Sequence, residues 1–208
     1  MTLYVPPHFR PENPDHLYAL MQQNAFGTLV TSGPRGLHVS HVPFLAERGS
    51  DGKLRLLAHL ARANEHWEAL EDATHLVAIF QGPHGYISPG WYQNHPSVPT
   101  WNYAVVHAHG RARLMDEAQL HELVITLSNT YEAGRAKPWR AGDLPADYVS
   151  SMLKAIVGFE IEVERLEGKF KISQNRPAEI PRVIEALVQD GEPELAAFMR
   201  AHPPPAKG

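Results

Sequence analysis

The most unusual concentration of residue types lies in the segment GPHGYISPGWY, Gly82 to Tyr92. Glycine and proline allow the backbone to approach a bound molecule closely, and aromatic rings supply flat surfaces on which a planar group can stack. Two interpretations are open: the segment forms the wall of a cofactor pocket, or it forms a small aromatic core that covers one end of a barrel. Trp101 and Tyr103, in the segment VPTWNYAVVHAHG that follows, leave the same two interpretations open.

A second group of residues carries donors that a phosphate group requires. His59 stands at the predicted end of a strand, and Arg62 follows it in the turn Ala61–Asn64, before a predicted short helix. A guanidinium and the backbone amides at the start of a helix both favour a phosphate. The alternative is a turn in which Arg62 is only solvated.

The segment GKFKISQNR, Gly168 to Arg176, concentrates further polar side chains. They are Lys169, Lys171, Ser173, Gln174, Asn175 and Arg176. Such donors can hold a phosphate or the polar edge of a ring system. The alternative is a solvated loop whose residues cap the structure before Pro177.

Thirteen histidines raise the question of a metal or haem site. His107 and His109 share one face of a predicted strand at i, i+2, but no carboxylate stands at ligand spacing beside them in the sequence, and the zinc-binding helix motif is absent. We therefore expect no metal site. The sequence also has no cysteine, no Ser–His–acid arrangement, no phosphate-binding glycine loop and no Rossmann fingerprint. We expect no hydrolytic nucleophile, and whether the chain is an enzyme stays open.

The composition places the chain among ordinary globular proteins, with 43% hydrophobic and 20% charged residues in a length of 208. That length suits one domain over residues 1–208. The net charge of −4 gives no general positive field for the phosphate backbone of DNA. No signal peptide is recognisable, and no apolar run approaches the roughly 20 residues that cross a bilayer. We expect a cytoplasmic protein with no membrane partner.

The elements that hold these residues are expected to be mainly strands, because apolar and polar residues alternate over short runs bounded by turn residues. The predicted strands are Gly27–Ser32, Leu37–Leu45, Leu54–His59, His75–Phe80, Asn102–Met115 and Phe159–Val163. We expect the first three to form a meander. Gly82–Tyr103 is predicted to be an ordered loop, and Gly168–Arg176 a loop after the closing strand.

Helical periodicity predicts peripheral helices around these strands. They are Asp15–Asn24, Asn64–Leu70, Asp116–Tyr131, Pro145–Lys154, Ala178–Gln189 and Glu192–Arg200, with Asp116 as an N-cap. Within the strand Asn102–Met115, five successive residues on one face are small and apolar. They are Ala104, Val106, Ala108, Gly110 and Ala112. A long strand with such a face suits the wall of a tightly curved barrel.

Several motifs occur together and in order along the chain. They are YVPPHFR (Tyr4–Arg10), FGTLVTS (Phe26–Ser32), QGPHGYISPGWY (Gln81–Tyr92), VPTWNYAVVHAHG (Val98–Gly110) and IVGFEIEVERLEGKFKISQNR (Ile156–Arg176). In this respect the chain resembles the PaiB-type, FMN-binding negative transcriptional regulator family over nearly its whole length. The resemblance implies an α+β fold: a mainly antiparallel split β-barrel, related to pyridoxamine-phosphate-oxidase-like flavoproteins, with peripheral helices. It also implies a homodimer in which each FMN site uses both subunits.

The same resemblance implies which residues hold the flavin. The phosphate and ribityl contacts would come from Ser40, His59, Arg62 and Asn64. Trp101 would lie beside the ring, and the residues donated across the dimer would be Lys171, Gln174 and Asn175.

Three functions remain in competition. The first is a flavin-binding regulatory protein; because no predicted helix pair carries the Arg- and Lys-rich face of a helix-turn-helix, its link to DNA would be indirect, through a regulatory protein or a redox change. The second is an FMN-dependent oxidoreductase that uses NAD(P)H, in which the flavin performs the hydride transfer. The third is haem binding on the same barrel by His107 or His109.

Overall fold

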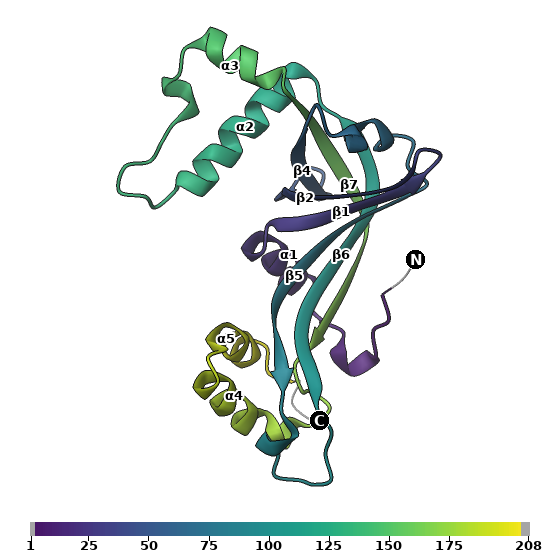
Figure 1. Ribbon diagram of the computed structural model, residues 1–208, viewed down its shortest axis with the longest axis vertical. Coiled ribbons are helices and arrows are strands. Elements are labelled where there is room, and N and C mark those ends of the chain that lie inside the picture. Colours follow the sequence, from purple (N-terminus) through teal and green to yellow (C-terminus); the bar gives the residue numbers. More distant parts are fainter. Residues whose placement is uncertain (1–2, 205–208) are drawn as a thin grey trace. The chain divides into compact units, whose positions relative to one another are not determined.

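The computed structural model describes residues 3–204, so Met1–Thr2 and Pro205–Gly208 at the ends of the predicted domain lie outside the described residues. The strands are β1 (Phe26–Gly33), β2 (Gly36–Pro43), β3 (Leu45–Arg48), β4 (Leu54–Ala61), β5 (His75–Ile87), β6 (Thr100–Leu114) and β7 (Ile156–Lys171) (Figure 1). The α-helices are α1 (Pro14–Gln23), α2 (Glu117–Glu132), α3 (Ala146–Leu153), α4 (Ile180–Gln189) and α5 (Pro193–Ala201). Short 3-10 helices are η1 (Pro7–Phe9), η2 (Glu65–Ala69), η3 (Pro89–Trp91), η4 (Ala141–Asp143) and η5 (Pro177–Glu179).

The seven strands form one sheet in the order β2-β1-β5-β6-β7-β4-β3. β1 pairs antiparallel with β2 and β5, and β4 pairs antiparallel with β3 and β7. The predicted helices are present, with Asn64–Leu70 as the 3-10 helix η2. Asp116 caps α2 in a capping box with Gln119, as the sequence predicts for the N-cap.

The predicted meander of the first three strands is wrong, because β4 pairs with β3 and β7 and not with β2. β2 ends at Pro43, which has no N–H to continue a ladder, and the buried Phe44 turns the chain into β3. On β4, the buried Leu56 and Ala58 lie opposite Ile161 and Phe159 of β7. This pairing between strands that are far apart in the sequence buries the apolar residues of both strands. Turn residues indicate only which neighbouring strands pair, so they do not predict it.

Two predicted loops are shorter than expected, because β5 continues to Ile87 and β7 continues to Lys171. Gly82 and Gly85 therefore lie inside a strand. A Cβ on Gly82 would stand 3.1 Å from the side chain of Leu20, and one on Gly85 would stand 3.0 Å from Leu195. These glycines allow close packing within a strand, and the loop predicted from them is wrong at these positions.

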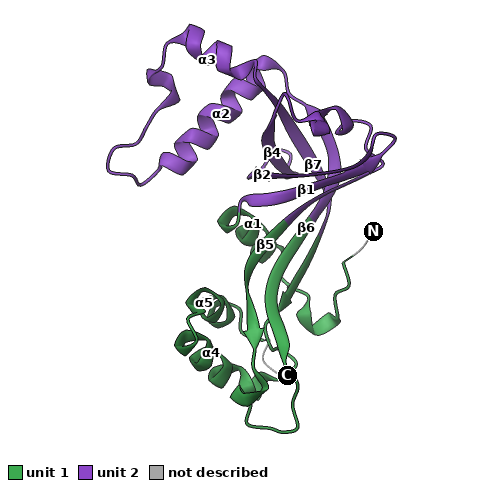
Figure 2. Cartoon of the chain, in the orientation of Figure 1, with its two compact units in different colours: residues 1–24, 80–107, 167–208 green, residues 25–79, 108–166 purple. Residues whose placement is uncertain are grey.

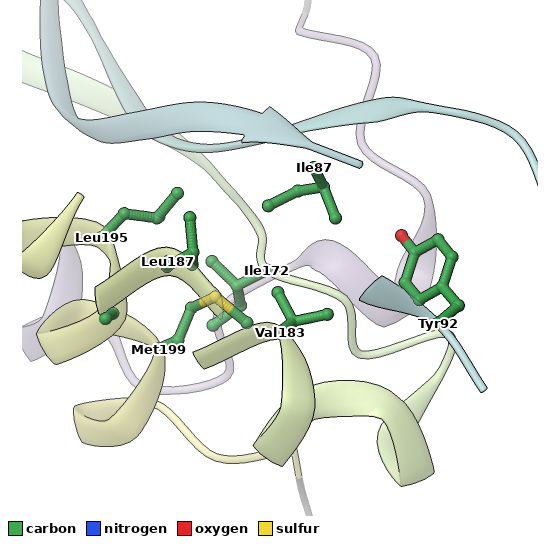
Figure 3. Packing of buried hydrophobic residues seen from close by; sticks show 8 residues of the cluster. Ile87, Tyr92, Ile172, Val183, Leu187, Leu195 and Met199 are labelled. Atoms are coloured by element: carbon green, nitrogen blue, oxygen red, sulfur yellow. The ribbon is translucent and has the colours of Figure 1, made fainter. Parts of the chain in front are cut away.

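The chain divides into two compact units, shown in Figure 2: unit 1 comprises residues 1–24, 80–107 and 167–208, and unit 2 comprises residues 25–79 and 108–166. In unit 1 a buried apolar cluster joins the end of β5 to α4 and α5 (Figure 3). Its members are Ile87, Tyr92, Ile172, Val183, Leu187, Leu195, Ala196 and Met199. The expectation of one domain over residues 1–208 stays a prediction.

Unit 2 has its own core on the inner face of its strands. Leu29, Leu56, Phe159 and Ile161 are fully buried, and Phe44 meets Phe159 edge-on at a ring distance of 6.3 Å. On β6 the predicted small face is buried at Ala104 and Val106, which belong to unit 1, and at Ala108, which belongs to unit 2. Within residues 3–204, no helix has the length and apolar character that crossing a membrane requires.

Candidate functional site

A buried polar cluster in unit 2 contains two of the predicted phosphate residues, Ser40 and Asn64. Asn64 Nδ2 donates to Ser40 Oγ over 3.1 Å. The ring of His66 lies between two hydroxyls, with Nδ1 2.8 Å from Ser40 Oγ and Nε2 2.9 Å from Thr31 Oγ1. Thr31, Ser40 and His66 are all buried. We call Thr31, Ser40, Asn64 and His66 the hydroxyl–histidine cluster.

Three elements position this cluster. Strand alternation puts Thr31 on the inner face of β1 with Leu29, and Leu29 pairs with Ser40 of β2, so both hydroxyls face the same way. Asn64 Oδ1 accepts from the backbone N–H of His66 over 3.1 Å and so caps η2. The cap fixes His66 above the two hydroxyls.

His66 is held in its neutral form. Burial, and secondarily the charge of His38, lowers the pKa of His66 from 6.5 to about 4. The ring of His38 stacks on that of His66 with 5.3 Å between the centroids. At neutral pH the imidazole of His66 therefore has one N–H donor and one nitrogen acceptor.

Arg62 and His59, the other two predicted phosphate residues, lie at the end of β4. Arg62 Nε and Nη2 donate to the backbone carbonyls of Lys154 and Ile156 over 2.8 and 3.1 Å, and its guanidinium lies 5.9 Å from the ring centre of Trp67. His59 Nδ1 is buried and has no hydrogen-bond partner among residues 3–204. Burial also lowers the pKa of His59, so a neutral ring with an unused nitrogen faces the protein interior.

In unit 1 the structure brings the predicted ring residue Trp101 together with Lys171. Lys171 Nζ donates to Thr100 Oγ1 and to the carbonyl oxygen of Trp101. Trp101 is 55% exposed and stacks on His84 with 6.4 Å between ring centroids. Burial, followed by the neighbouring charge of Lys169, lowers the pKa of Lys171. The exposed indole offers a flat surface on which a planar ring can stack.

Gln174 and Asn175 lie in the turn after β7. Gln174 Oε1 accepts from the N–H of Ile172 over 2.8 Å, and Gln174 Nε2 donates to the carbonyl of Phe170. The amide of Gln174 therefore closes its own turn. Asn175 is exposed. Their contacts to a flavin stay predictions.

Sequence reasoning missed His66 and Thr31 and left Lys169 as one donor among several. Lys169 is only 7% exposed, and its ammonium lies 5.2 and 5.3 Å from the ring centres of Tyr4 and Tyr103. The available signal was only partial: Thr31 shares a strand face with the buried Leu29, and a buried hydroxyl needs a partner.

The haem alternative rested on His107 and His109, which strand alternation places together on the half-buried face of β6. In unit 1 a ring nitrogen of His107 and a carboxylate oxygen of Glu167 lie within 4.8 Å of each other. Glu167 is distant from His107 in the chain, so sequence spacing does not reveal this carboxylate. Glu167 Oε2 also accepts from the N–H of Leu3 over 3.1 Å. The expectation of no metal site stays a prediction.

Comparisons with known proteins give the chain its family. Residues 3–165 match the model of a family described as "Putative FMN-binding domain". This match includes Ser40, His59, Arg62, Asn64 and Trp101, whereas Lys171, Gln174 and Asn175 follow it. The chain is 35% identical over 192 residues to the Bacillus subtilis protein named Protease synthase and sporulation protein PAI 2, and the alignment covers 92% of each chain.

Two solved structures are similar in fold. The FAD and haem binding protein from Mycobacterium smegmatis has a TM-score of 0.58 at 14% identity, covering 78% of this chain and 73% of that one. The flavocytochrome Anf3 from Azotobacter vinelandii has a TM-score of 0.56 at 17% identity, covering 78% and 69%. The predicted α+β fold, a mainly antiparallel split β-barrel, is confirmed. With the matched domain and the Bacillus relative, the chain belongs to the PaiB-type family of proteins that carry this FMN-binding domain.

Proposed function

We propose that this protein binds FMN as a homodimer and works as a cytoplasmic flavin-dependent regulatory protein. The observation that carries the proposal is the family match over residues 3–165 together with 35% identity to the Bacillus subtilis relative. When bound, FMN supplies redox chemistry, and the protein supplies binding and orientation.

The phosphate end of FMN is assigned to residues of unit 2. A phosphate monoester needs several donors, and charged or amide donors are the most effective. Ser40 and Asn64 are already joined by a hydrogen bond. Arg62 uses Nε and Nη2 for backbone carbonyls and keeps Nη1 for a ligand, because no described residue accepts from that nitrogen. The contact of His59 with the ribityl chain is proposed from the family resemblance alone, because Nδ1 of His59 is buried. This donor set fits the polar end of FMN.

By the family resemblance, Trp101 would lie beside the ring of the flavin, and Lys171, Gln174 and Asn175 would be donated across the dimer. The indole of Trp101 is exposed enough to cover a flat ring. Within one subunit Lys171 Nζ donates to the carbonyl oxygen of Trp101, so a subunit that donates Lys171 to its partner's flavin brings its own Trp101 close to that flavin as well. An ammonium close to the polar edge of an isoalloxazine would stabilise the electron-rich reduced ring. These roles are part of the proposal.

The homodimer is supported by an exposed apolar face on the sheet of unit 2. Register pairs place Leu37 and Val39 of β2 on one face with Val30 of β1 and Val77 of β5. Leu37 is 70% exposed and Val39 is 54% exposed. Monomeric proteins rarely present a contiguous apolar face of this kind, and a second copy would cover it.

The regulatory link to DNA is proposed to be indirect, through a regulatory protein or a change in the oxidation state of the flavin. The net charge of −4 gives no general attraction to DNA. The NAD(P)H-dependent oxidoreductase differs from this proposal in one measurable way: NAD(P)H would bleach the bound flavin. Haem binding at His107 or His109 would instead give a Soret band that is lost in a His→Ala variant.

Equilibrium titrations of the purified protein with FMN, FAD and haem test the proposal. We expect saturable FMN binding at one site per subunit, with FAD weaker, because the phosphate donors of unit 2 are matched to a terminal monoester. Preference for FAD or haem, or no flavin binding, would contradict it.

A further inference from the structure

His66 uses both ring nitrogens inside the hydroxyl–histidine cluster, and the cluster contains more donors than a neutral imidazole can accept. Ser40 Oγ lies 2.8 Å from His66 Nδ1 and accepts a hydrogen bond from Asn64 Nδ2 over 3.1 Å. Thr31 Oγ1 lies 2.9 Å from Nε2. Since His66 is 2% exposed, water cannot readily replace any of these partners. The positions of the hydrogens therefore decide what Ser40 offers to a ligand.

Two proton arrangements satisfy these distances. In the first, the Ser40 hydroxyl donates to Nδ1 and Nε2–H donates to Thr31; Ser40 then has no hydrogen left for a ligand. In the second, Thr31 donates to Nε2, Nδ1–H donates to Ser40, and Ser40 accepts from both His66 and Asn64. The hydroxyl hydrogen of Ser40 then has no acceptor among the described residues.

We propose that His66 is a positioning residue for the phosphate of the flavin. His66 Nδ1–H donates a hydrogen bond to Ser40 Oγ, so that the hydroxyl hydrogen of Ser40 is left to donate to a phosphate oxygen. The inference rests on the proposed function and adds to it a residue outside the predicted site. A phosphate dianion selects the second arrangement, since it accepts hydrogen bonds and donates none. On the other side of the ring, the Thr31 hydroxyl donates a hydrogen bond to Nε2. This bond favours the tautomer in which Nε2 is unprotonated and Nδ1 carries the proton.

The amide variants of His66 separate the two ring nitrogens. The amide nitrogen of Asn takes the place of Nδ1 and can still donate to Ser40, whereas that of Gln takes the place of Nε2 and cannot. The affinity ratio of FMN to riboflavin isolates the phosphate, and the riboflavin affinity reports whether a variant still folds around the ring. A lost hydrogen bond to a charged group corresponds to about 10- to 150-fold.

We expect His66→Gln and Thr31→Val to lower the FMN to riboflavin ratio by about tenfold or more, and His66→Asn to keep it within a few-fold. The double variant Ser40→Ala with His66→Gln should lose no more than Ser40→Ala alone, because His66 acts through Ser40. Equal ratios in His66→Gln and His66→Asn, or losses that add in the double variant, would overturn the inference. Wild-type protein that binds both flavins equally would also overturn it while leaving flavin binding intact; binding of neither would contradict the proposed function itself.

Nitrogen-15 NMR of the imidazole shows which ring nitrogen of His66 carries the proton. A purely structural role of His66 would not require the proton to be on Nδ1 in the FMN complex. In the FMN complex we expect the proton of His66 on Nδ1, with Nε2 unprotonated. The same tautomer should persist in His38→Asn, which removes the stacked ring but no member of the cluster. A proton on Nε2 in the FMN complex would overturn the inference.

Discussion

Gly110 of β6 lies so close to Glu162 of β7 that a Cβ on Gly110 would fall 2.0 Å from the carbonyl oxygen of Glu162. The obstacle is backbone, so it cannot move aside as a flexible side chain would. Gly110 thus allows the two strands of unit 2 to approach, and its lack of a side chain is a requirement of the sheet.

Gly110→Ala should destabilise the protein by about 1–3 kcal/mol or more, because the strand must shift to admit the methyl group. The midpoint of urea unfolding measures this effect. Gly142→Ala is the matched control, since a Cβ there would meet nothing within 4 Å. Equal stability of the two variants would show that the close approach of β6 and β7 is wrong.

The unfolding free energy should fall as the pH drops from about 6.5 to about 4, in part through His66. The folded state holds this ring neutral, with its pKa lowered to about 4, and the unfolded chain protonates it near 6.5. The unfolded state binds more protons in this window, so the stabilisation is complete above pH 6.5 and is lost toward pH 4. The shift corresponds to about 3 kcal/mol.

Unfolding measured at several pH values in wild type and His66→Asn isolates this contribution. His59 and His202 also have pKa values lowered chiefly by burial, so both proteins should retain some acid sensitivity. Between pH 6.5 and 4, the pH dependence of the unfolding free energy in the variant should correspond to the uptake of about one proton fewer on unfolding than in the wild type. An identical dependence in both proteins would exclude His66 as a titrating group in this range.

Leu37→Lys combined with Val39→Lys should convert the proposed homodimer to a monomer. Two charges placed on the apolar face of β2 would have to be desolvated in the interface. Light scattering coupled to gel filtration measures the mass. Val188→Lys serves as the control, because Val188 is an exposed apolar residue on α4. Wild-type protein that is already monomeric would count against the dimer.

Arg62→Ala and Lys171→Ala should each weaken FMN binding by about 1.5–3 kcal/mol if their donors contact the flavin, since bonds to charged groups have this strength. Fluorescence titration with FMN gives the dissociation constants. Lys53→Ala removes a cation whose exposed ammonium is paired with Glu162, and it should leave the affinity unchanged. Unaltered FMN affinity in Arg62→Ala and Lys171→Ala would remove both residues from the site.

The sequence allowed most elements of the fold to be predicted, because alternation and helix caps are local signals. The capping residue Asp116 and the small buried face at Ala104, Val106 and Ala108 are examples. The partner of β4 was not predictable in the same way, since the pairing of Leu56 with Ile161 joins residues that are distant in the chain. The extension of β5 past Gly82 was missed because glycine indicates turns and close packing alike.

The residues of the candidate site stay predictions. Ser40 and Asn64 were predicted from the family resemblance, and the structure joins them by a hydrogen bond. His66 and Thr31 were missed because their relation depends on η2 lying across the inner face of β1 and β2, which no local pattern encodes. Gln174 was predicted as a ligand, yet its amide also closes its own turn, a use that depends on the backbone conformation after β7.

The most direct test of the central claim is the absorption spectrum of the protein purified without added cofactor, followed by FMN titration of the colourless fraction. We predict the bands of oxidised flavin, or saturable micromolar binding at one site per subunit. A spectrum without flavin bands, combined with no saturable FMN binding, would contradict the account and leave only the barrel fold in place.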